Sequence, residues 1–173
     1  MKVVPAQKPG SSVQNVETPQ EFIDAVEKAF GKIHWDLAAT ASNTKASHWL
    51  GPGSVTHKDL SSLDVDWSSL QPDGNTVRGR AKQTNLWLNP PYADIEPWAR
   101  KCAQTSMKNT RIFLLTPAVV GTNYFKNYIF EVATVFFLSP RIKFVGHTQG
   151  YPKDMILSVY GATSGFECWR WDE

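Results

Sequence analysis

Hydrophobic residues in this chain fall into short segments whose spacing alternates between that of strands and that of helices. Apolar runs predict buried strands at residues 33–37, 86–88, 111–115, 135–138, 142–145 and 155–160. Apolar residues at helical spacing predict helices that begin near Thr18, Asp94 and Thr122. Because helices alternate with strands early in the chain and strands cluster at its end, we expect an α/β fold with a mostly parallel sheet and antiparallel strands at the C-terminal end.

Two of the predicted helices have start signals in the sequence. Thr18 is a candidate cap followed by Pro19, a residue that suits the first helical position, and Gly31 ends the apolar stripe of that helix. Asp94 is a candidate cap for the second helix, with Ile95 as its first helical residue. The first of these helices is expected to open the folded part of the chain.

Length and composition favour one compact unit. Residues 1–16 have linker composition without periodicity, so we expect a flexible N-terminal arm there and a single domain over residues 17–173. The chain contains two cysteines, too few for a disulfide framework, and no cluster of metal ligands, so we expect a reducing cytoplasm and no metal. No apolar run approaches the roughly 18 residues that cross a bilayer, and we expect no membrane partner. The formal net charge of +2 alone neither requires nor excludes a nucleic-acid partner.

The most specific chemistry lies in the stretch Asn89-Pro90-Pro91-Tyr92, directly after the predicted strand at residues 86–88. Two prolines forbid both continuation of the strand and immediate entry into a helix, so the stretch forms a rigid loop at a strand's C-terminal end. The Asn89 side-chain oxygen and the Pro90 carbonyl offer two acceptors to one amino group, and the Tyr92 ring offers a face for a base. A surface turn is the alternative, which the strand before and the helix after disfavour.

A second candidate site follows the strand at residues 33–37. Residues 38–43 form a loop of small residues, which allow a ligand to approach the backbone closely. The loop contains no glycine, and Asp36 before it is either part of a ligand site or a cap at the end of the strand. The residues alone leave both interpretations open.

In their order along the chain, these stretches resemble the phage N-6-adenine DNA methyltransferases. The stretch at residues 89–92 is similar to motif IV of the amino-methyltransferases, and Thr18-Pro19 is similar to motif X of the adenine methyltransferases. The resemblance runs from about Glu17 to Gly161. The loop after Asp36 departs from the usual Asp-Pro-x-x-Gly-x-Gly pattern of the cofactor loop.

The resemblance implies a Rossmann-like methyltransferase that moves a methyl group from S-adenosylmethionine to the exocyclic N6 amine of adenine in DNA. Because this amine is paired inside a duplex, the base has to be flipped out, and Tyr92 is expected to stack on it through its ring and not to act through its hydroxyl. The implied catalytic residues are Asn89, Pro90, Pro91 and Tyr92. The implied cofactor-binding residues are Thr18, Pro19, Asp36, Ala38, Ala39 and Asn43. We expect a monomer or weak dimer, in the host cell cytoplasm if a phage encodes it.

Other functions remain open on the sequence alone. The stretch at residues 89–92 does not distinguish DNA from RNA or a protein amide as the methyl acceptor. A non-catalytic nucleic-acid-binding module with the same fold is favoured by the glycine-free loop. A hydrolase is disfavoured because residues 161–165 do not form a Gly-x-Ser-x-Gly nucleophile elbow. Target specificity is expected either to be relaxed or to lie in the loop from Gln71 to Gln83.

Overall fold

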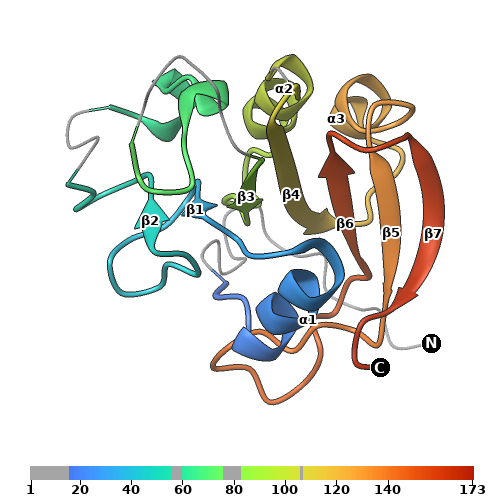
Figure 1. The fold of residues 1–173 in the computed structure, drawn as a ribbon. Coiled ribbons are helices and arrows are strands. Elements are labelled where there is room, and N and C mark those ends of the chain that lie inside the picture. The colour runs from blue at the N-terminus through green and yellow to red at the C-terminus, as the bar shows by residue number, and fades with distance from the viewer. Residues whose placement is uncertain (1–15, 56–59, 76–82, 106) are drawn as a thin grey trace, which may run out of the picture.

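The computed structural model describes residues 16–55, 60–75, 83–105 and 107–173, whose strands form one seven-stranded sheet with helices on both faces (Figure 1). The helices are α1 (Gln20–Phe30), α2 (Glu96–Gln104) and α3 (Asn123–Tyr128), with the 3-10 turns η1 (Ser62–Asp64) and η2 (Trp67–Ser69). The strands are β1 (Trp35–Asp36), β2 (His48–Trp49), β3 (Thr84–Leu88), β4 (Thr110–Pro117), β5 (Thr134–Ser139), β6 (Met155–Tyr160) and β7 (Gly165–Arg170). The mixed α/β class predicted from the hydrophobic pattern is therefore confirmed.

The strands lie in the order β2-β1-β3-β4-β6-β5-β7. Each neighbouring pair is parallel except the two pairs that β6 makes with β4 and β5. The sheet is thus mostly parallel, as predicted, but its antiparallel part is β6 alone, and the last strand, β7, runs parallel to β5. Because β2 and β3 lie on opposite sides of β1, the strand order reverses beside β1. In open α/β sheets, ligands bind at such a reversal, outside the carboxyl ends of the strands.

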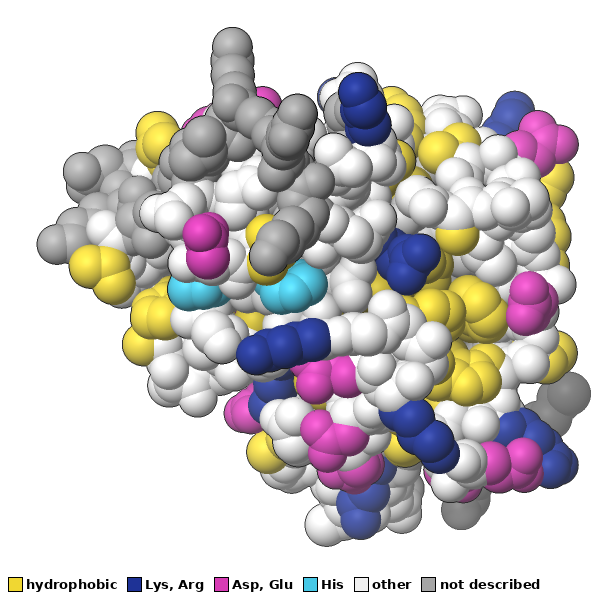
Figure 2. All heavy atoms as spheres, viewed as in Figure 1, with side chains coloured by type: hydrophobic (Ala, Val, Ile, Leu, Met, Phe, Trp, Pro, Cys, Tyr) yellow, Lys and Arg dark blue, Asp and Glu magenta, His cyan; other side chains and the backbone are white. Residues whose placement is uncertain are grey.

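The two faces of the sheet bury different helices because successive strand residues point in opposite directions. Ile112 and Leu114 of β4 pack in the apolar cluster that contains α2 and α3. Phe113 and Leu115, between and beside them, pack in the cluster that contains α1. Figure 2 shows hydrophobic side chains gathered in the middle of the face in view, while Lys and Arg side chains are spread among Asp and Glu.

The helix starts differ from the predictions. Pro19 is the cap residue of α1 and lies just before its first turn, and the Thr18 side chain does not cap the helix. Ile95, not Asp94, is the cap residue of α2, and it makes no side-chain cap bond. Gly31 does end α1, with a φ of 93° that favours glycine. The Thr18 hydroxyl instead accepts a hydrogen bond from the Asn89 side chain, so its partner lies far away in the sequence.

Four strand assignments also differ. Residues 142–145 form no strand, although Ile142 and Phe144 are buried against the α1 cluster, because both edges of β5 are already paired with β6 and β7. The strand predicted at residues 33–37 has only Trp35 and Asp36 in its ladder. The pattern did not predict β2 or β7, since β2 has two residues and the side chains of β7 are mostly exposed.

Several sequence predictions fall wholly or partly outside the described residues. These are the N-terminal arm up to residue 15 and part of the loop from Gln71 to Gln83. Val16, which the pattern assigned to the arm, is buried in the α1 cluster. The single domain over residues 17–173 stays a prediction. None of the described helices is long and apolar enough to span a membrane.

Candidate active site

Two adjoining hollows open at the C-terminal ends of β1 and β3, where the strand order reverses. The first, named here the polar compartment, has an empty volume of about 440 Å³ and is lined by Glu17, Thr18, Asp36, Lys45, Trp87 and Asn89, among others. The second, the apolar compartment, has an empty volume of about 1270 Å³ including space open to solvent and is lined by Leu37, Leu50, Gly51, Leu60, Ser62 and Trp98, among others. The two share Ala38, Asn43 and Pro91. They are therefore parts of one continuous site.

Asn89 follows the last residue of β3 and is held by the segment that precedes α1. Its Nδ2 donates to the Val16 carbonyl at 2.7 Å and to the Thr18 hydroxyl at 3.2 Å. The Val16 carbonyl can only accept, so the amide nitrogen must face it and the amide oxygen must face the other way. Oδ1 accepts the Tyr92 hydroxyl at 2.8 Å. An amide oxygen has two lone pairs, so one acceptor position of Asn89 is left after this contact.

Tyr92 is half-buried and packs against both apolar clusters. Its ring lies edge-on to Tyr151, with centroids 6.0 Å apart. Burial raises the pKa of the Tyr92 hydroxyl well above its usual value, so the group is a neutral donor. The expectation that the hydroxyl has no part in the site does not fit this geometry, because the hydroxyl holds the Asn89 oxygen. Stacking of a base on the ring stays a prediction.

Asp36 ends β1 and organises the loop that follows it. Its side chain is 4% exposed, and its two oxygens accept the backbone N–H groups of Ala38 and Lys45 at 3.3 and 3.0 Å. Burial is the main cause that raises the pKa of this carboxyl to about 6, against the lowering effect of the two N–H groups. Asp36 is therefore both the strand-end cap and a wall of the polar compartment.

The glycine-free loop is closed by its own side chains. Asn43 Oδ1 accepts from the Thr40 backbone N–H at 2.7 Å and from the Thr40 hydroxyl at 3.1 Å. On the far side, Lys45 pairs with Glu17 at 2.7 Å, which ties the loop to the segment before α1. Because these contacts fix the backbone, the loop does not need glycine to adopt its turn.

A glycine from outside the loop provides the close approach that we expected within it. A Cβ on Gly51 would lie 2.2 Å from the Ala39 carbonyl oxygen, and the residue has a φ of +140°. Only glycine allows the chain after β2 to pass this close to the loop. The Ser62 hydroxyl, buried beside the same compartment, has no hydrogen-bond partner among the described residues. An unpaired buried hydroxyl is a group that a ligand in this compartment can satisfy.

The structure brings most of the predicted site residues together. Those that line the polar compartment are Thr18, Asp36, Ala38, Asn43, Asn89, Pro90 and Pro91. Ala39 lines the apolar compartment, whereas Tyr92 lines neither and contacts the site through Asn89. Pro19 lines neither compartment, and its carbonyl accepts from the first turn of α1.

Sequence reasoning missed Lys45, Gly51, Ser62 and Trp98 as wall residues. Among these residues, Gly51 alone had a visible signal in the sequence, the Gly-Pro-Gly turn at residues 51–53. A turn directly after an apolar residue marks a loop at the end of a strand. Within the described part of the chain, no group of three or more His, Cys, Asp or Glu side chains is placed to hold a metal ion.

Comparison with known proteins assigns a family to this arrangement. The family described as "DNA N-6-adenine-methyltransferase (Dam)" matches residues 7–156, a span that contains both compartments. A search of curated proteins finds no match to the chain. The match names a reaction and not a phage source.

Proposed function

The chain belongs to the DNA N-6-adenine-methyltransferase (Dam) family, and from that premise we propose that it transfers a methyl group from S-adenosylmethionine to the N6 amine of adenine in DNA. The observation that carries the proposal is the fixed orientation of Asn89. Both hydrogens of its amide are used by Val16 and Thr18, so its orientation is fixed and its oxygen keeps one acceptor position, which we assign to the target amine. Such preorganised acceptors are effective because they need no reorientation when charge develops.

Asn89 Oδ1 and the Pro90 carbonyl are the two groups that we propose hold the amine. Both residues line the polar compartment, directly after β3. Two acceptors bind the two hydrogens of a planar amine and orient its nitrogen toward the methyl donor. They also polarise the N–H bonds, so that electron density shifts from the hydrogens onto the nitrogen. Methylation makes the nitrogen acidic, so the proton leaves to solvent and no dedicated base is required.

The residues present fit S-adenosylmethionine. The space that a ligand can occupy in the apolar compartment is about 670 Å³, within the roughly 300–1,000 Å³ of typical ligand pockets, and its Leu50 and Trp98 walls suit a flat ring. The Ser62 hydroxyl, which has no partner among the described residues, is a group that the bound cofactor would satisfy. We assign the cationic methionine end to the polar compartment, because the Asp36 carboxyl lines it. When bound, S-adenosylmethionine supplies the activated methyl group.

The alternatives receive less support from the geometry. The non-catalytic module was favoured by the absence of glycine from the loop, but Asp36 and Asn43 order that loop and Gly51 provides the close approach. RNA or a protein amide as acceptor has no feature that favours it. We further propose a monomer or weak dimer in the cytoplasm, in keeping with the free thiols of Cys102 and Cys168.

The proposed function is tested with S-adenosylmethionine carrying a tritiated methyl group. The protein is incubated with double-stranded DNA, single-stranded DNA or RNA, and the product nucleosides are separated by chromatography. Label in N6-methyldeoxyadenosine, absent with Asn89→Ala, is the expected result. Label that enters RNA alone would overturn the assignment of DNA as the substrate. Binding of S-adenosylmethionine without any methyl transfer would overturn the assignment as an enzyme.

A further inference from the structure

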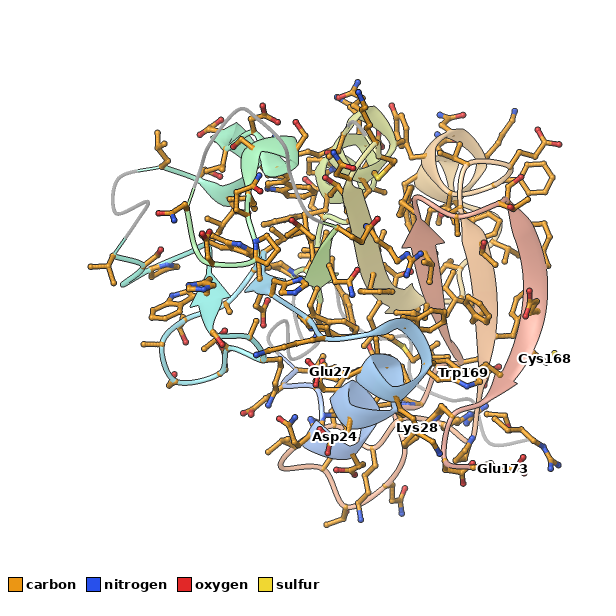
Figure 3. The ribbon with its side chains drawn as sticks, in the orientation of Figure 1. Asp24, Glu27, Lys28, Cys168, Trp169 and Glu173 are labelled. Atoms are coloured by element: carbon orange, nitrogen blue, oxygen red, sulfur yellow. The ribbon has the colours of Figure 1, made fainter. Side chains whose placement is uncertain are left out.

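The last residues of the chain pack against α1. They follow residue 156, where the family match ends. Trp171 is fixed to the loop after β5, because its backbone N–H donates to the Ser139 carbonyl at 3.1 Å and its Nε1 donates to the Pro140 carbonyl at 2.7 Å. The Glu173 carbonyl accepts from Lys28 of α1 at 3.1 Å. Figure 3 shows Trp169 on the side of β7 that faces α1 and Cys168 on the other side. The chain end therefore joins the helix to the sheet.

Phe22 connects this chain end to β3. The Phe22 ring is fully buried. Its centroid lies 5.1 Å from that of Trp171, with the two ring planes at 88°, and 6.2 Å from that of Trp87. Trp87 belongs to β3, lines the polar compartment and precedes Asn89 by two residues. Edge-to-face aromatic contacts depend on orientation, so they fix the helix in position as well as burying it. A continuous aromatic path thus runs from Trp171 to the wall of the site.

The residues just before α1 connect the helix to the Asn89 side chain in a second way. Thr18 directly precedes Pro19, the cap residue of α1, and both Thr18 and Val16 accept from the Asn89 amide. A shift of the helix would move these two acceptors relative to β3. Because misplacement of a reacting group by about 1 Å can slow a reaction about 100-fold, small movements here matter.

We propose that Trp171 is a positioning residue for methyl transfer, which acts through Phe22 to hold α1 against β3 so that Asn89 keeps its orientation. The inference rests on the proposed function, because Asn89 is there the acceptor of the target amine. Trp171 itself lines neither compartment.

The first test reads the Asn89 side chain directly and needs no activity. The side-chain amide signal of Asn89 is identified by NMR from its loss in Asn89→Ala. In Trp171→Ala this signal should shift and its hydrogens should exchange faster, whereas Trp171→Phe, which keeps a ring against Phe22, should resemble the parent. Phe166→Ala is the matched control, because it removes a ring of the neighbouring strand β7 that is 48% exposed. If Trp171→Ala does not fold, Trp171→Leu takes its place.

The second test measures the coupling between Trp171 and the Asn89 anchor. Trp171→Ala should lower kcat about tenfold in the parent. In Thr18→Val, where one anchor of Asn89 is already lost, the same change should lower kcat by less than about threefold. Equal losses in the two backgrounds, or an unchanged Asn89 signal, would overturn the proposal. If the parent methylates no nucleic acid, the proposed function fails, while the NMR signal still decides whether Trp171 fixes Asn89.

Discussion

At the scale of single residues, the Asn89 side chain makes more contacts than a surface turn requires. Three groups from two parts of the chain bind it: the Val16 carbonyl, the Thr18 hydroxyl and the Tyr92 hydroxyl. A side chain held in this way has lost its rotamer freedom before any substrate arrives, so substrate binding does not have to order it. This is the physical reason for which we propose a catalytic role for Asn89 in addition to its structural one.

Replacement of Asn89 with alanine should lower kcat by about 100-fold or more, because one preorganised polar contact to the reacting group is lost. Folding should survive, since the side chain is only half-buried. The measurement is single-turnover methyl transfer to DNA, with circular dichroism as the check on folding. Asn127→Ala, at an exposed position on α3, is the control. A variant with the parent's rate would show that the amide oxygen does not hold the amine.

Tyr92→Phe removes the hydroxyl that holds the Asn89 oxygen but keeps the ring. A neutral hydrogen bond contributes about 0.5–1.5 kcal/mol, so kcat should fall by roughly twofold to tenfold. Tyr92→Ala should in addition lose roughly 1–3 kcal/mol of base stacking. The two effects are separated with DNA that carries 2-aminopurine at the target, whose fluorescence rises when the base leaves the stack. Unchanged base flipping in Tyr92→Ala would count against the stacking role.

Asp36 predicts a pH dependence of cofactor binding. Burial raises the pKa of its carboxyl to about 6, so the group is mostly neutral at lower pH and mostly ionised at higher pH. The ionised form attracts the cationic S-adenosylmethionine, and affinity should therefore rise by up to about tenfold between pH 5 and 7.5. Calorimetry at the two pH values measures it, with Asp36→Asn as the control that should be weaker and flat. An equal slope in the control would assign the dependence to another group.

At the scale of elements, the site depends on two short strands that carry little of the sheet. β1 and β2 have two ladder residues each, yet the loops after them form most of the apolar compartment. Their register is fixed by the parallel pairing of Trp35 with both His48 and Leu86. Short strands leave long loops at the reversal of strand order, and those loops are free to form a binding site.

Gly51→Ala should disturb this loop pair. The added Cβ would meet the Ala39 carbonyl oxygen at 2.2 Å, and the positive φ adds strain, so the free energy of unfolding should fall by at least roughly 1–3 kcal/mol. S-adenosylmethionine affinity should fall with it. Gly53→Ala is the matched control, because Gly53 also has a positive φ but its added Cβ meets nothing within 4 Å. Equal effects of the two substitutions in urea unfolding would mean that strain, and not close approach, explains Gly51.

At the scale of the whole molecule, α1 joins β3, in the interior of the sheet, to the edge strand β7. Phe22 on its buried face contacts Trp87 of β3 and the Trp169 and Trp171 rings at the chain end. Removal of a large buried ring at such a junction destabilises by about 3–5 kcal/mol, so Phe22→Ala should lower the urea midpoint strongly. Phe137→Ala, with a side chain that is 37% exposed, should lower it much less. Similar midpoints would show that α1 is not part of the cooperative core.

Strong local patterns account for the parts of the fold that were predicted. The stretches that became β3, β4, β5 and β6 are almost wholly apolar, and the stripe of α1 ends at a glycine, so neighbours in the sequence already favour one structure. The two prolines after β3 likewise fixed the loop at residues 89–92, because they exclude both regular alternatives. Residues 142–145 show the limit, since two of their side chains are buried although the residues pair with no strand, and both edges of the preceding strand β5 are occupied.

The sequence by itself determined the fold class, the loop that carries Asn89 and the kind of chemistry that its residue types suit, because these follow from periodicity and from the properties of single side chains. Only the tertiary structure decided which groups meet. Thr18 was predicted to cap a helix, and its side chain instead binds Asn89. Tyr92 was expected to act through its ring alone, but its hydroxyl binds Asn89. Gly51 was given no role in the site, although it passes close to Ala39. Thr18 and Asn89 are 71 positions apart in the sequence, and Ala39 and Gly51 are 12 positions apart. Even Tyr92 reaches Asn89 only through the turn between them. A linear pattern reports spacing and polarity, whereas the meeting of distant groups is set by how the strands order themselves in the sheet.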